Sequence, residues 1–201
     1  MKDFLGLTGK AASSVYVGSF FNKTCEIDLV SGWNLISIYC EADNMSIANV
    51  LSSLGNNYVS IHTYDRYDPS DKWKAYKPGL PSWVIQDLDT ISVNQGYWIN
   101  MANNDTLVFN GKLKYPRIIF LFQGWNLAGY PSNKTNLVNE SFIDVITNLD
   151  SVHMYNASDE SDHWKVYSPN FEPSQNDLVN MTPNYGYWVR MNANDTWMVD
   201  E

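Results

Sequence analysis

A tandem duplication limits the fold of this chain more than any other feature. Four segments of the first half recur in the same order in the second half, and the offset falls only from 92 residues to 90 along the chain. The pairs are 29–35 with 121–127 (LVSGWNL and LFQGWNL), 60–64 with 151–155, 73–78 with 164–169 (WKAYKP and WKVYSP), and 96–99 with 186–189 (GYWI and GYWV). Because a repeated sequence indicates a repeated structural unit, we predict two homologous domains, 24–113 and 114–201, after an N-terminal segment, 1–23.

Each copy has the pattern of a small antiparallel β-domain with one short helix. The predicted strands of the first copy are 25–30, 33–40, 58–64, 72–76, 97–101 and 106–109. The first two pair as a hairpin through Ser31 and Gly32, and the last two form another hairpin. The helix is predicted at 47–54 and, in the second copy, at about 141–149. The fold class is therefore mainly β (α+β), as either a barrel or a sandwich.

The N-terminal segment allows three interpretations. Residues 14–21 loosely resemble residues 106–113, which precede the second copy. They form an ordinary first strand, the last strand of an earlier module in a longer array, or an extension that adds a strand to a neighbouring subunit. The first residues lack a signal-peptide pattern, which favours a piece of a longer protein.

Cys25 and Cys40 are the two cysteines of the chain. The predicted hairpin places them on adjacent strands, slightly out of direct register. This arrangement is consistent with a disulfide, and two buried free thiols are the alternative.

The charge balance excludes one class of partner. The net charge is −9 and lysines and arginines do not cluster, whereas nucleic-acid binding needs clustered cations to neutralise phosphates. No apolar run approaches the roughly 18–20 residues of a membrane span.

The repeated motifs resemble those of a known family. The order Gly-Trp-Asn-Leu, then Trp-Lys-x-Tyr, then Gly-Tyr-Trp is similar to the GWN…GYW repeat module of secreted surface and cell-envelope proteins of archaea and some bacteria. The second copy is the closer match, while the first has Ser37 to Cys40 where the pattern has a proline. The resemblance covers residues 27–201 and implies an extracellular location and a β-rich architecture without catalysis.

Most tryptophans occupy equivalent positions in the two copies. The equivalent pairs are Trp33 and Trp125, Trp73 and Trp164, and Trp98 and Trp188. A buried indole contributes a large apolar area, so we predict that these six form the core, with a sugar-stacking platform as the alternative. Trp83 and Trp197 have no counterpart and are the predicted exposed ligand contacts.

The chain contains eight Asn-x-Ser/Thr sequons, more than its composition gives by chance. They begin at Asn22, Asn44, Asn104, Asn133, Asn139, Asn156, Asn180 and Asn194. This excess predicts N-glycosylation of a secreted chain. The alternative is a composition rich in turn-forming asparagine and threonine.

Other groups of polar residues give weak indications of a site. The acidic loops 65–71 and 156–162 offer oxygen ligands for calcium, but their spacing is not that of an EF-hand, and a solvated loop is the alternative. His62, His153 and His163 lack the spacing of a zinc site. No nucleophile elbow or phosphate-binding glycine loop is present, so we predict no cofactor and no enzyme activity.

These features lead to three ranked hypotheses for function. The first is a non-catalytic structural module of a cell-surface layer, stalk or filament, acting through contacts with its own copies or neighbouring surface domains. The second is a carbohydrate-binding or adhesion module. The third is an accessory domain of a secreted hydrolase.

Overall fold

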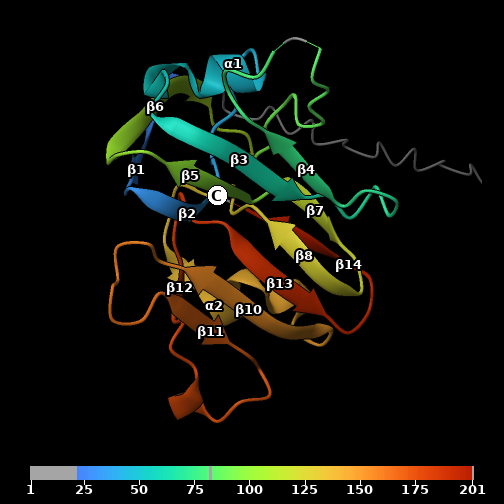
Figure 1. Cartoon of the computed structure of the whole chain (residues 1–201). Helices are drawn as coiled ribbons and strands as arrows, with labels where there is room; N and C mark the ends of the chain where they lie inside the picture. The colour runs from blue at the N-terminus through green and yellow to red at the C-terminus, as the bar shows by residue number, and fades with distance from the viewer. Residues whose placement is uncertain (1–21, 82, 201) are drawn as a thin grey trace, which may run out of the picture.

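The computed structural model describes residues 22–81 and 83–200, and it is mainly β with two short helices (Figure 1). The strands of the first half are β1 (Asn22–Leu29), β2 (Gly32–Ile36), β3 (Tyr58–Tyr64), β4 (Trp73–Tyr76), β5 (Tyr97–Met101) and β6 (Asp105–Lys112). Those of the second half are β7 (Arg117–Leu121), β8 (Gly124–Ala128), β9 (Asn136–Leu137), β10 (Leu149–Tyr155), β11 (Trp164–Tyr167), β12 (Asn180–Met181), β13 (Tyr187–Met191) and β14 (Asp195–Val199). The predicted segment 14–21 lies outside the described residues.

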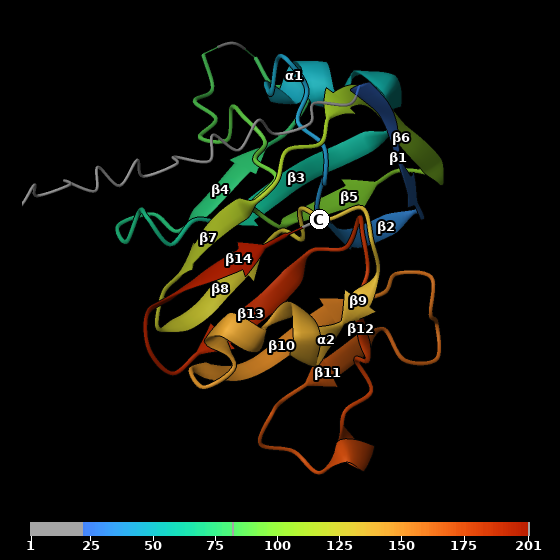
Figure 2. The same ribbon diagram turned by 180° about the vertical axis from the view of Figure 1, so that it is seen from behind.

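The main sheets of the two halves have the same topology, and the second half adds a short sheet of β9 and β12. The first half has a four-stranded antiparallel sheet in the order β2-β5-β3-β4, and the second has β8-β13-β10-β11. In each half a separate two-stranded sheet, β1-β6 or β7-β14, lies on one side of the larger sheet, the side that faces the viewer in Figure 2. The prediction of mainly antiparallel β-structure is therefore confirmed.

The predicted strand pairing is wrong. Strand β1 pairs with β6 rather than β2, and β5 pairs with β2 and β3 rather than β6. Strands β3 and β4, for which no partner was predicted, pair with each other. The turn before β2 moves the chain from one sheet to the other instead of folding it back beside β1. Gly32 has a φ of 88°, and the side chain of Asn34 accepts from Val30 N (3.0 Å) and donates to Val30 O (2.7 Å). The Gly-Trp-Asn motif thus builds a corner rather than a hairpin.

The helices are shorter than predicted, and the second begins earlier. Helix α1 spans Ile47–Val50 and continues as the 3₁₀ turn Ser52–Leu54, within the predicted range. Helix α2 spans Val138–Ser141, with a 3₁₀ turn at Ile143–Val145, so the predicted start at residue 141 is wrong. Val138 and Phe142 are both buried, and this i, i+4 pair places the helix one turn earlier.

Each half has its own interior, between its four-stranded sheet and the elements behind it. Strand β5 shows why: Tyr97, Ile99 and Met101 are buried on one face, while Trp98 and Asn100 between them point the other way. Helix α2 covers the inner face of the second sheet, on the side away from the viewer in Figure 1.

Trp197 belongs to this interior, so its predicted role as an exposed ligand contact is wrong. Its side chain is fully buried and stacks on Phe142 at a centroid distance of 4.3 Å. Its indole Nε1 donates a hydrogen bond to the backbone oxygen of Ser141 (2.5 Å). Position 197 points inward on β14, where the equivalent position of β6 carries the buried Leu107.

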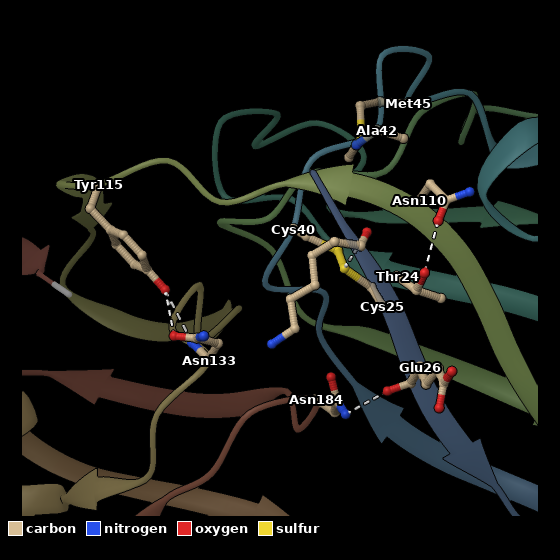
Figure 3. Close-up of a disulfide and its surroundings, with 11 residues drawn as sticks. Thr24, Cys25, Glu26, Cys40, Ala42, Met45, Asn110, Tyr115, Asn133 and Asn184 are labelled. Carbon is tan, nitrogen blue, oxygen red and sulfur yellow. Dashed lines mark hydrogen bonds between the residues drawn. A yellow bond between two sulfur atoms is a disulfide. The ribbon is translucent and has the colours of Figure 1, made fainter. Parts of the chain in front are cut away.

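Cys25 and Cys40 form a disulfide (Figure 3). It joins β1 to the segment that follows β2, not two strands of one hairpin. The bond lies near the junction of the halves, where Asn184 donates from Nδ2 to the backbone oxygen of Glu26 on β1 (2.9 Å).

Candidate functional site: an exposed aromatic face

The outer faces of the two four-stranded sheets carry the repeated tryptophans. Strand alternation and the pairing register define the outward positions. In the first half these are Trp33, Leu35, Ser60, His62, Tyr64, Trp73, Ala75, Trp98 and Asn100. In the second half they are Trp125, Leu127, Ser151, His153, Tyr155, Trp164, Val166, Trp188 and Arg190.

The prediction that the six equivalent tryptophans form the core is therefore wrong. The exposed fractions are 44% for Trp33, 49% for Trp73, 39% for Trp125 and 46% for Trp164, and the remaining two are half-buried. The interiors are filled instead largely by aliphatic side chains and tyrosines. We call this outward surface the aromatic face.

Two buried leucines lie beside the central tryptophans of the aromatic face. Leu35 lies opposite Trp98 in the register, and Leu127 lies opposite Trp188. Both leucines are buried although neither belongs to an interior cluster. Each leucine packs against the glycine of the other half's Gly-Tyr-Trp motif, Leu35 at Gly186 and Leu127 at Gly96.

The rings form two clusters with matching geometry. We call them the Trp98 cluster (Trp33, His62, Trp98, Tyr155 and Trp164) and the Trp188 cluster (Trp125, His153, Trp188, Tyr64 and Trp73). The centroids of Trp98 and Trp33 are 6.3 Å apart, and those of Trp188 and Trp125 are 6.2 Å apart. Edge-to-face contacts of this kind are favourable for aromatic pairs.

Each cluster takes rings from both halves of the chain. Trp98 of the first half contacts Tyr155 (5.1 Å) and Trp164 (5.9 Å) of the second. Reciprocally, Trp188 of the second half contacts Tyr64 (5.3 Å) and Trp73 (6.0 Å) of the first. The tryptophan of each Gly-Tyr-Trp motif therefore crosses to the other half.

The glycine of the same motif permits this crossing. Gly186 donates its backbone N–H to Leu35 O (3.2 Å), and Gly96 donates to Leu127 O (3.2 Å). A Cβ at Gly186 would lie 2.6 Å from the backbone oxygen of Ile36, so only glycine fits without displacing the main chain. The two halves meet along these reciprocal backbone contacts.

An open groove of about 460 Å³ runs along the aromatic face. It is lined by Tyr64, Trp125, His153, Trp164 and Trp188. Tyr64 comes from the first half and the other four residues from the second. The groove therefore lies at the junction.

The aromatic face carries little charge. Arg190 has the only charged side chain among its outward positions. Its guanidinium lies 5.7 Å from the ring of Trp125 and contacts Asp150 (3.3 Å). The equivalent outward position in the first half carries Asn100.

Burial favours the neutral form of the two histidines on the aromatic face. The imidazole Nε2 of His62 lies 3.0 Å from Ser60 Oγ, and that of His153 lies 3.0 Å from Ser151 Oγ. Burial lowers the pKa of both imidazoles below the usual 6.5. Each neutral imidazole–hydroxyl pair can both donate and accept hydrogen bonds.

A second hollow, of about 480 Å³, is lined by side chains that make hydrogen bonds between the two halves. Arg66 crosses it to donate to Gln123 O (2.9 Å) and lies over the ring of Phe122. The side chain of Asn94 also donates to Ile118 O (3.2 Å). These contacts join the two halves of the chain.

Trp83 and His163 are not among the outward positions of the aromatic face, although His163 borders it through its contact with Tyr155. Trp83 is 81% exposed and has none of the ring contacts found among the described residues. His163 sits beside Tyr155, with its Nδ1 3.0 Å from Asn156 O.

In both predicted calcium loops, acidic side chains form ion pairs with a lysine. Lys74 pairs with Asp68 (2.8 Å) and Asp71 (3.4 Å), and Lys165 pairs in the same way with Asp159 and Asp162. In the described part of the chain, no group of three or more histidine, cysteine or acidic side chains is arranged to hold a metal ion.

The sequon asparagines are mostly on the surface. Asn44, Asn104, Asn139, Asn180 and Asn194 are exposed, and Asn133 and Asn156 are half-buried. Asn22 is the first described residue, at the start of β1. Where the side chain of a sequon asparagine forms a hydrogen bond, its amide oxygen is the acceptor. Asn104 Oδ1 accepts from Ser31 N (2.8 Å), and Asn194 Oδ1 accepts from Gln123 N (2.7 Å).

Comparisons with known proteins found no match to a family model, a curated protein or a solved structure. Within residues 22–81 and 83–200, no helix is long and apolar enough to cross a membrane.

Proposed function

We propose that this protein is a carbohydrate-binding module and that the aromatic face binds an uncharged glycan. The observation that carries the proposal is the partial exposure of six repeat-equivalent tryptophans on one nearly uncharged surface. A contiguous exposed apolar surface on a folded protein marks an interaction site. The carbohydrate hypothesis therefore ranks above the structural one, because the rings that the structural hypothesis assigned to the core face the solvent.

The chemistry of the aromatic face fits a sugar. A pyranose presents apolar C–H groups on its ring faces and hydroxyl groups at its edges. The indole rings match the C–H faces, and the His62–Ser60 and His153–Ser151 pairs offer donors and acceptors for hydroxyl groups. Binding sites of this kind combine aromatic walls with a few placed polar groups.

The charge distribution favours an uncharged ligand. The chain carries a net charge of −9, and Arg190 is already paired with Asp150. An anionic ligand would meet a repulsive long-range field without a free cluster of cations. A neutral glycan pays no such cost.

The wider setting remains that predicted from the sequence. In this proposal the chain is a duplicated pair of GWN…GYW modules, extracellular and N-glycosylated, and it acts without catalysis. Its exposed sequon asparagines support the glycosylation, because their bonded oxygen leaves the amide nitrogen for the sugar. Structural contacts with surface neighbours are compatible with this role.

A glycan array tests the proposal. The array includes neutral β-1,4-linked glucose and N-acetylglucosamine oligosaccharides together with acidic glycans. We expect binding to a neutral glycan that Trp188→Ala abolishes or weakens at least tenfold. Trp83→Ala is the matched control, since Trp83 is exposed but lies outside the aromatic face. No glycan binding, or loss of binding only in the control, contradicts the proposal.

A further inference from the structure

The aromatic face has a symmetry that a single binding site does not require. Each cluster repeats the contacts of the other: Trp33 lies 5.5 Å from His62, and Trp125 lies 5.2 Å from His153. The crossing rings also match, with Trp98 over the second half and Trp188 over the first. A reciprocal arrangement of this kind relates two equivalent surfaces by an approximate two-fold axis.

We infer that the aromatic face holds two equivalent glycan subsites, each built from both halves, so that one long glycan chain is held at two points. This inference rests on the proposed function. One subsite is the Trp98 cluster, and the other is the Trp188 cluster. The groove lies where they adjoin, since it is lined by Trp164 of the first cluster and by four residues of the second.

Neither half carries a complete subsite. Without the second half, Trp98 would lose the contacts with Tyr155 and Trp164. Without the first half, the groove would lose Tyr64 as one wall. The pair of copies is therefore the unit that binds, and the Gly-Tyr-Trp motif is the element that couples them.

The ring orientations fit a single soluble glycan chain better than the flat surface of a crystalline polysaccharide. The planes of Trp98 and Trp164 meet at 62°, and those of Trp125 and Trp188 meet at 89°. Rings at such angles present ridges and furrows, whereas a crystal face needs coplanar rings. A flexible glycan chain can follow the furrows.

Two subsites change how affinity depends on ligand length. A short oligosaccharide occupies each subsite independently, so two molecules bind per protein chain. A polysaccharide long enough to reach both subsites gains from the high effective concentration of its second segment, by about 100-fold or more.

Calorimetry with the full chain tests this inference. The probes are the β-1,4-linked glucose or N-acetylglucosamine oligosaccharides that bind on the array, from dimer to octamer, and the soluble polysaccharide of the same unit. We expect two short ligands per chain, and only one in Trp98→Ala or in Trp188→Ala. In both variants the polysaccharide should lose the 100-fold gain of wild type.

Matched variants guard against misfolding. Trp33→Ala and Trp125→Ala remove one more exposed ring from each cluster, and unchanged circular dichroism establishes that the variants fold. A single short ligand per wild-type chain, or one cluster whose variants leave all binding intact, overturns the two-subsite inference while the proposed function stands. If no neutral glycan binds on the array, the proposed function itself fails.

Discussion

Replacing Trp197 should destabilise the protein far more than replacing any tryptophan of the aromatic face. Trp197 is fully buried and stacks on Phe142. Trp→Ala in a core costs about 3–5 kcal/mol. The substitution also removes the donor to Ser141 O, which leaves a partly buried carbonyl without this partner at a further cost of about 1 kcal/mol.

Trp125 provides the comparison. It is 39% exposed, so truncation to alanine removes a smaller buried area and leaves an opening that water fills. The cost should be about half of the 3–5 kcal/mol that a buried tryptophan costs, roughly 1.5–2.5 kcal/mol, and among the described residues no hydrogen bond of the indole is lost in addition.

Urea denaturation of both variants measures the difference. We expect the midpoint of Trp197→Ala to fall well below that of Trp125→Ala, with the slope of the free energy against urea little changed. Glycan binding at a temperature where both are folded should show the reverse order. Equal stabilities, or a more severe loss for Trp125→Ala, would refute the division into interior and aromatic face.

Three further outcomes follow from single contacts. Cys25→Ser with Cys40→Ser should lower the free energy of unfolding by about 3 kcal/mol, as expected for a loop of this length, and urea denaturation measures the loss. Arg190→Asn should raise the pKa of His153 in an NMR titration, because the guanidinium charge lowers it in the native protein. Folding lowers the pKa of His62 and of His153, so as the pH falls the unfolded chain binds protons at these residues before the folded chain does. Stability should therefore be full above about pH 6.5 and decline as the pH falls below it, which melting curves can follow.

The sequence predicted the strands better than their partners. The bounds of β3 follow from alternation, and the polar loop after it is compatible with the antiparallel pairing of β3 with β4. The partner of β1 does not follow from the local sequence, because a two-residue turn containing glycine is compatible with a hairpin and with a corner between sheets. The long-range pairing of β1 with β6 decides between them, and no local pattern encodes that pairing.

The orientation of the tryptophans could have been predicted from the motif itself. In Gly-Tyr-Trp the aromatic residues are adjacent, so on a strand they must point to opposite faces. Tyr187 is buried and its hydroxyl accepts from Thr182 N (2.6 Å), and Trp188 therefore points outward. The crossing of Trp188 to the other half was not predictable, since it depends on how the two halves meet.

The three residues of this motif perform three linked tasks. Gly186 allows the backbones of the two halves to touch, Tyr187 fixes the strand to its own interior, and Trp188 reaches the rings of the other half. Loss of the glycine should therefore affect both stability and binding. A Cβ at Gly186 would lie 2.6 Å from a backbone oxygen, and relieving that overlap costs about 1–3 kcal/mol. It would also move Trp188 away from Tyr64, so Gly186→Ala should weaken glycan binding although position 186 touches no ligand. If calorimetry finds wild-type affinity in a folded Gly186→Ala variant, the backbone contact at Gly186 does not position Trp188 for binding, and this reasoning is wrong.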